Sequence, residues 1–128
     1  MPLKKTFKDM PQAVSTQSYV VAGIEVVIQG LEELRPKTKS ITCLWMLHPR
    51  LDTKETMAPL AATMIQEWNL HIESGKAGMN PVGLITVSFD QRNHGGRLAS
   101  KIANETWRDG NVNHAQDMFS SYREILST

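Results

Sequence analysis

Cysteine is nearly absent from this sequence of 128 residues. The one cysteine, Cys43, leaves no possibility of a disulfide within the chain. It lies in the apolar run from Ile41 to Leu47, so we expect it to be buried as a small hydrophobic residue and not to act as a reactive thiol. Low cysteine usage is typical of a reducing compartment, and we expect a cytoplasmic protein.

The sequence also lacks long apolar runs and an excess of charge of either sign. Because no stretch of about 18 apolar residues is present, we expect no membrane span. Fourteen basic and thirteen acidic side chains give a net charge of +1, which argues against nucleic acid as a partner. A hydrophobic fraction of 41% is typical of a single soluble domain.

Several catalytic and cofactor-binding motifs are missing as well. The sequence contains no G-x-S-x-G, no phosphate-binding Walker loop, no G-x-G-x-x-G, no H-E-x-x-H and no C-x-x-C. No pair of carboxylates has a spacing that suggests acid–base catalysis. We therefore expect no cofactor, and we assign no catalytic residue within the chain.

Apolar patterns predict an α/β sheet that follows a polar N-terminal segment, residues 1–15. Two β-branched runs, 19–22 and 24–31, meet at Gly23 and predict an antiparallel hairpin. Runs 40–47 and 82–89 are almost continuously apolar, which is typical of parallel strands covered on both faces.

A helix is predicted between these two apolar runs. Its apolar face repeats with helical spacing and consists of Met57, Leu60, Ala61, Met64, Ile65, Trp68 and Ile72. Thr53 or Thr56 is expected to cap it, with Pro59 in its first turn and Gly75 at its end. A strand, a helix and a strand in this order predict a right-handed βαβ crossover. A last helix is predicted over residues 114–126.

Two polar loops follow the carboxyl ends of the predicted parallel strands, the edge at which open α/β sheets bind ligands. One loop is His48-Pro49-Arg50-Leu51 and the other runs from Asp90 to Arg97. The simplest interpretation of the second loop is structural, with Asp90 accepting backbone N–H groups and Arg92 bracing a neighbouring loop. A zinc site formed by His48, His94 and Asp90 is a minor alternative, and we assign no metal ligand.

The segment VSFDQRNHGGR resembles the D-x-R-G-x-G signature that follows the fourth strand of the α/β-hydrolase superfamily. Asp90, Arg92 and Gly95 occupy the matching positions, while Asn93 replaces the first glycine. Upstream, LWMLHPRL resembles the end of the family's third strand, and the order and spacing match over residues 18–125. The pattern is most similar to uncharacterised fungal members of serine-hydrolase type. The resemblance implies an incomplete α/β-hydrolase domain over residues 16–128.

The resemblance also implies a function, the hydrolysis of ester or related acyl bonds in a small-molecule substrate. It assigns His48, Pro49, Arg50 and Leu51 to the oxyanion loop, and Asp90, Arg92, His94 and Gly95 to a structural loop after the fourth strand. Pro49 has no N–H, so Arg50 or Leu51 must provide the donor that the family takes from this loop. In the family the nucleophile, the acid and the catalytic histidine come later. We therefore expect a chain that is truncated before the nucleophile elbow and inactive alone.

The family's strand order places one further strand beside residues 40–47. Without it the outer edge of this apolar strand would be open, and we expect self-association through that edge. The alternative to a hydrolase fragment is a non-catalytic interaction module that recruits a partner by strand addition.

Overall fold

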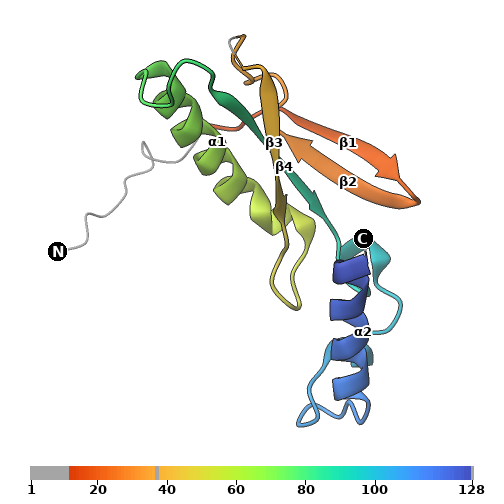
Figure 1. Cartoon of the computed structure of the whole chain (residues 1–128). Coiled ribbons are helices and arrows are strands. Elements are labelled where there is room, and N and C mark those ends of the chain that lie inside the picture. Colours follow the sequence, from red (N-terminus) through yellow and green to blue (C-terminus); the bar gives the residue numbers. More distant parts are fainter. Residues whose placement is uncertain (1–11, 37, 128) are drawn as a thin grey trace, which may run out of the picture.

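The computed structural model describes residues 12–36 and 38–127 (Figure 1). Most of the predicted N-terminal segment, residues 1–15, lies outside this range. In chain order the elements are β1 (Thr16–Val21), β2 (Ile24–Gln29), β3 (Ser40–Met46), the 3-10 helix η2 (Lys54–Met57), α1 (Ala58–Glu73), β4 (Val82–Phe89), the 3-10 helices η3 (Gly95–Arg97) and η4 (Ile102–Asn104), and α2 (His114–Ser127).

The four strands form one mixed sheet in the order β1-β2-β4-β3. β1 pairs with β2 and β2 with β4 in antiparallel orientation, whereas β3 and β4 are parallel and α1 lies between them in the chain. The predicted hairpin, helices and parallel strand pair are therefore confirmed, and the fold class is α/β. At the hairpin turn, Ala22 and Gly23 both have positive φ, 50° and 80°, as the tight turns that match the strand twist require.

The core is divided between the two faces of the sheet. On one face α1 packs on β4, where the fully buried Ile65 contacts Val14, Ala62 and Leu84. The strand registers put Val26, Val87 and Phe89 on the opposite face, where Ile24 and Ile28 complete a second cluster. Trp45 adds to this second cluster, since its ring meets that of Phe89 edge-on, and Ile125 of α2 lines a small cavity beside the two rings.

The prediction that β3 is covered on both faces is wrong. Ile41 is 53% and Trp45 is 55% exposed, and Cys43, expected to be buried, is exposed as well. The physical reason is the position of β3 at the end of the sheet, where one side has no neighbouring strand and α1 packs on β4 and β2. Partial burial nevertheless raises the pKa of the Cys43 thiol, which disfavours the reactive thiolate.

The predicted apolar face of α1 is also only partly buried. Ala61 and Ile65 are buried, but Leu60 is 51% exposed and Met64 is exposed too. Pro59 lies in the first turn, as predicted, and Gly75 follows the helix with φ 77°. Neither Thr53 nor Thr56 caps the helix as expected.

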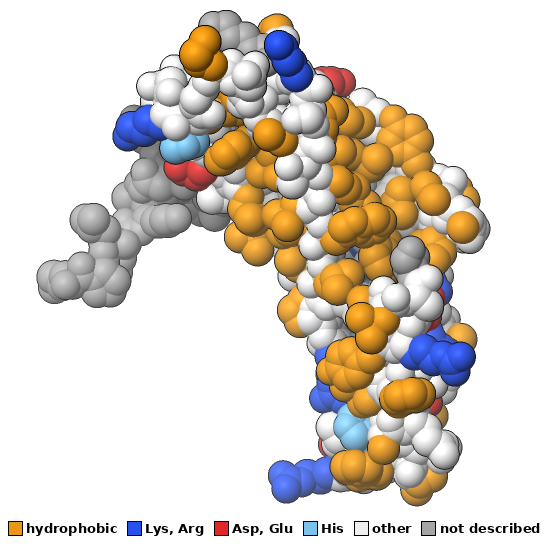
Figure 2. Space-filling model, in the orientation of Figure 1, with side chains coloured by type: hydrophobic (Ala, Val, Ile, Leu, Met, Phe, Trp, Pro, Cys, Tyr) orange, Lys and Arg blue, Asp and Glu red, His pale blue; other side chains and the backbone are white. Residues whose placement is uncertain are grey.

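α2 extends away from the sheet as a separate arm (Figure 1). Figure 2 shows hydrophobic side chains over the sheet and along this arm, and Tyr19, Trp45, Phe119 and Tyr122 are all at least 45% exposed. Among the helices of the described residues, none is long and apolar enough to cross a bilayer.

Candidate functional site

The two loops singled out in the sequence lie side by side at the carboxyl edge of β3 and β4. His48, which is only 3% exposed, joins them through both of its ring nitrogens. Its Nε2 accepts the N–H of Gln91 at 3.0 Å, so the ring must carry its proton on Nδ1, which donates to the carbonyl of Pro49 at 2.8 Å. The side-chain amide of Gln91 donates in return to the His48 carbonyl. His48 therefore acts as a neutral bridge that holds the β3 loop against the β4 loop.

Asp90 organises the same edge from the end of β4. Its carboxylate accepts the N–H of Lys54 at 2.9 Å, the N–H of Gly96 at 2.9 Å and the Lys54 ammonium at 3.0 Å. Burial alone would raise the pKa of Asp90, but these hydrogen bonds and the positive charge outweigh it, and the pKa is lowered. Burial likewise disfavours charged Lys54, yet its contacts with Asp90 and Glu55 raise its pKa. A buried ion pair thus joins the start of the β4 loop to η2, which follows the β3 loop.

Lys54 was not identified from the sequence, where it is one lysine at the start of a helix. Its ammonium also lies 3.0 Å from Glu55 and 3.8 Å from Glu25. Gly95, which follows in the β4 loop, has φ 51°, and a Cβ at this position would lie 2.3 Å from an Asp90 carboxylate oxygen. This close approach explains why a residue with a Cβ does not fit at position 95.

The β3 loop turns tightly between Pro49 and Asp52. The N–H of Asp52 donates to the Pro49 carbonyl at 3.2 Å, and Leu51, at the third position of the turn, has φ 66°. A positive φ at that position defines a type II turn, which normally carries glycine. The Asp52 carboxylate accepts the Thr53 N–H and the Thr56 hydroxyl, and these bonds lower the pKa of Asp52. The start of η2 is therefore stabilised by the side chain of Asp52, and no threonine side chain caps it.

The N–H groups of Arg50 and Leu51 have no acceptor among the described residues. Both residues are exposed, with Leu51 at 60%. The Arg50 side chain is fixed, because its guanidinium donates to the carbonyl of Asn104 at 3.0 Å. Two free amide donors therefore lie at the sheet edge in a loop held at both ends.

Asn93 and Asn104 hold the chain beyond the β4 loop. Asn93 has φ 61°, a conformation that asparagine tolerates well, so it can replace the signature glycine there. Its side chain accepts the N–H groups of Ala99 and Ser100, at 2.8 and 2.7 Å, and donates to Asn104 at 2.9 Å. The side chain of Arg92, expected to brace a neighbouring loop, makes no hydrogen bond or ion pair with the described residues, and Arg97 donates to the Asp90 carbonyl instead.

His94 lies beside His48, with ring centroids 5.2 Å apart. Its Nδ1 contacts the carbonyl of Arg92 at 2.8 Å, and its Nε2 is buried without a partner in the part of the chain that the structure describes. Both ring nitrogens of His48 are already hydrogen-bonded, Nε2 to the N–H of Gln91 and Nδ1 to the carbonyl of Pro49. Over residues 12–36 and 38–127, no three His, Cys, Asp or Glu side chains are grouped so that they could hold a metal ion.

A cavity of about 280 Å³ opens between the two loops and α2. Part of its lining is apolar, and the two loops contribute polar groups. The lining includes Leu47, His48, Arg50, Gln91, His94, Met118, Ser121, Tyr122 and Ile125. The arrangement combines exposed amide donors with an adjacent apolar space, the usual form of a small-molecule site.

Comparisons with known proteins give little guidance. No family model matches the sequence, and no curated protein matches it. Among solved structures, the chain is similar to the crystal structure of TT1662 from Thermus thermophilus, with 17% sequence identity and a TM-score of 0.39. The match covers 91% of this chain and 44% of that one, so the chain spans less than half the length of its structural neighbour. The fold class rests on the strand order and the connections described above.

Proposed function

We propose that this chain provides the oxyanion loop and one wall of the acyl pocket of a serine-type hydrolase that acts on ester or related acyl bonds. The observation that carries the proposal is the pair of unpartnered N–H groups of Arg50 and Leu51, in a loop from which Arg50 lines the 280 Å³ cavity. Hydrolysis of an ester passes through a tetrahedral intermediate whose negatively charged oxygen needs such donors.

The surroundings of the loop favour this role. Donors stabilise a transition state best when they are already held in place before the reaction. Here the His48 bridge and the Asp90–Lys54 ion pair fix the two ends of the turn. The positive φ of Leu51, unusual for a branched side chain, orients the turn at a cost in stability, as is common at functional positions.

In this proposal the nucleophile, the acid and the base come from polypeptide outside these 128 residues. A serine Oγ attacks the acyl carbon, the alcohol leaves, and water releases the acid from the acyl-enzyme. The N–H groups of the loop bind the carbonyl oxygen as it gains charge. None of the residues identified in this chain takes a proton in these steps.

The test has two stages. The 128-residue chain is first assayed with a chromogenic short-chain ester and a fluorophosphonate probe, and we expect neither turnover nor labelling. A labelled serine with turnover would contradict the assignment of the nucleophile to another segment. The source transcript is then sequenced beyond the codon for Thr128, and the encoded polypeptide is assayed in the same way. A downstream sequence without G-x-S-x-G and without esterase activity refutes the proposal.

The contribution of the loop is tested in that longer polypeptide with Arg50→Pro. Proline is favoured at the second position of a type II turn, so the change removes the N–H while preserving the backbone. Losing one oxyanion donor is expected to reduce kcat by about 100- to 1,000-fold. Arg50→Gln is the control, because it keeps the N–H and loses only the contact with Asn104.

A second candidate function is a non-catalytic interaction module. The observation that favours it is the edge position of β3 together with the exposure of Ile41 and Trp45, a combination that promotes strand pairing between chains. Trp45→Lys is expected to shift the chain towards monomer in analytical ultracentrifugation. Val20→Lys, on the opposite edge strand β1, is the matched control. A wild-type chain that is monomeric at high concentration contradicts this alternative.

A further inference from the structure

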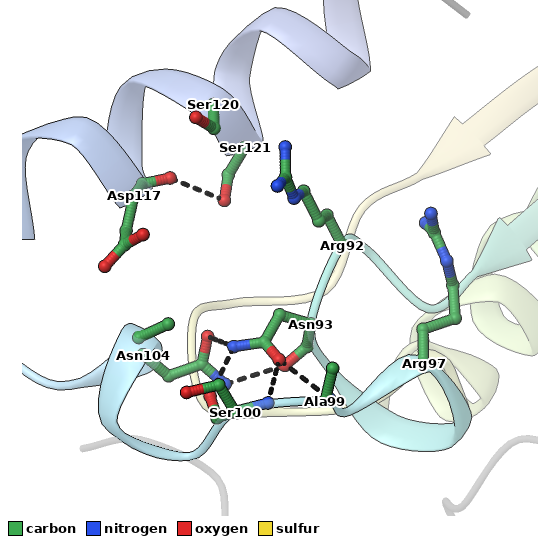
Figure 3. A pocket seen from close by; sticks show the side chains of 10 residues that line it. Arg92, Asn93, Arg97, Ala99, Ser100, Asn104, Asp117, Ser120 and Ser121 are labelled. Carbon is green, nitrogen blue, oxygen red and sulfur yellow. Dashed lines mark hydrogen bonds between the residues drawn. The ribbon is translucent and has the colours of Figure 1, made fainter.

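A second cavity, of about 250 Å³, lies next to the first, between the segment that follows β4 and the face of α2 (Figure 3). Both cavities are lined by Ala103, Asn104, Asp117 and Ser121, so they form two ends of one groove. The residues specific to the second cavity are polar: Arg92, Asn93, Arg97, Ser100 and Ser120, with Ala99 as the exception.

Hydrogen-bond donors without an acceptor gather at this polar end. The guanidinium of Arg92 has no partner in the described part of the chain, and Figure 3 shows its side chain extending towards Ser121 on α2. The hydroxyl groups of Ser100 and Ser120 also have no partner among residues 12–36 and 38–127. A guanidinium that lines a cavity together with hydroxyl groups can bind an oxyanion, because its paired N–H groups fit two oxygen atoms.

The charge of the lining indicates a single negative charge on the ligand. Arg97 is already paired with Glu124, so it contributes little net charge. The carboxylate of Asp117 also lines the groove, where it accepts a hydrogen bond from Asn111 at 2.9 Å. Among the described residues that line this end, Arg92 is the cation without a partner, and a dianion such as a phosphate monoester would be repelled by Asp117. A carboxylate fits this balance better.

The other end of the groove is suited to an apolar chain. Leu47, Met118, Tyr122 and Ile125 line it, and they come from the end of β3 and from α2. We propose that the groove binds a monocarboxylate with an unbranched apolar chain, with its carboxylate on Arg92 and its chain along α2. The apolar end is the same cavity that the proposed hydrolysis uses for the acyl group, whereas Arg92 and the polar end take no part in that reaction.

Binding of octanoate to the 128-residue chain, measured by isothermal titration calorimetry, tests the proposal. We expect saturable binding at one site per chain. Octanol lacks the charge and acetate lacks the chain, and each should bind at least about tenfold more weakly, since a charged hydrogen bond or a buried chain contributes more than 1.4 kcal/mol. Inorganic phosphate is included to test the preference for a single charge.

Arg92→Gln is expected to weaken octanoate binding by about tenfold or more, the effect of losing a charged hydrogen-bond pair. Because Arg92 is exposed and without a partner, the variant should fold as the wild type does. Arg123→Gln is the matched control, because Arg123 is exposed on α2 and lines neither cavity. No saturable binding of octanoate, equal binding of octanol, tighter binding of phosphate, or an unchanged affinity in Arg92→Gln would each overturn the proposal. Loss or absence of esterase activity would leave these results unaffected.

Discussion

The buried pair of Asp90 and Lys54 leads to the sharpest prediction about stability. Asp90→Asn keeps the shape of the side chain and removes its charge. The new amide can accept a hydrogen bond through one atom only, so its NH₂ group faces either the backbone N–H of Lys54 or both the Lys54 ammonium and the Gly96 N–H, all of which are donors. The change therefore leaves a buried cation and at least one unmatched donor.

The size of the effect follows from the surroundings of Lys54. Breaking a buried ion pair by removing one partner costs about 3–5 kcal/mol. Glu55 and Glu25 remain near the ammonium, but both side chains are more than half exposed and each offsets less than about 1 kcal/mol. We expect Asp90→Asn to lower the free energy of unfolding by about 3 kcal/mol. Lys54→Met should cost less, because Asp90 keeps its two backbone donors.

Urea unfolding followed by circular dichroism measures this difference. Glu67→Gln, the same carboxylate-to-amide change at an exposed position of α1, is the control and should alter the free energy of unfolding by less than about 0.5 kcal/mol. If Asp90→Asn also changes the free energy of unfolding by less than that amount, the Asp90–Lys54 pair does not stabilise the contact between the β4 loop and η2 as described.

The same pair predicts a pH dependence. The pKa of Asp90 is lowered in the folded state, so its contribution to stability is present above the unfolded pKa of about 3.9 and is lost as the pH falls through the folded value. The difference in stability between wild type and Asp90→Asn should therefore shrink as the pH is lowered below about 4. A difference in stability that grows as the pH is lowered would contradict the lowered pKa of Asp90.

Four further predictions follow from single positions. Gly30→Ala places a Cβ 2.7 Å from Ile65 Cδ1 at a residue with φ 90°, and it should destabilise the fold by about 1–3 kcal/mol in urea unfolding. Ile65→Ala, at a fully buried position, should cost about 2–5 kcal/mol in the same assay. Leu51→Gly should raise the midpoint of thermal unfolding and stabilise by about 1 kcal/mol, because it relieves a positive φ. Cys43 should react with iodoacetamide in the folded chain, as read by mass spectrometry, but more slowly than free cysteine at neutral pH because its raised pKa lowers the thiolate fraction.

The arrangement of strands and helices could be predicted because it depends on local signals. Apolar runs, the amphipathic repeat and the turn at Gly23 each lie within a few neighbouring residues, and all of them correspond to observed elements. The exposure of Trp45 and Cys43 could not be predicted in the same way. An apolar run looks alike in a central strand and in an edge strand, and the difference is made by chain segments distant in sequence.

The candidate site was predictable in position but not in detail. The ends of the apolar runs predicted that His48 and Asp90 lie at the carboxyl edge of the parallel strands, and the structure places both residues there. Lys54 gives no local signal, since an exposed lysine in the first turn of a helix would look the same. The groove beside α2 was not predicted either. Arg92 and Ser121 are separated by nearly thirty positions, and they line one cavity only because of the path that the intervening residues follow.

The strand order has a consequence for how the sheet is made during synthesis. β4 lies between β2 and β3, yet it leaves the ribosome after both of them. Until residues 82–89 emerge, the nascent chain can form only the β1–β2 hairpin, which is marginally stable alone, while β3 has no strand to pair with. The apolar residues of β3 are then exposed to other chains for as long as α1 takes to be translated. A pause in translation before β4 should therefore favour aggregation, and a pause after β4 should not.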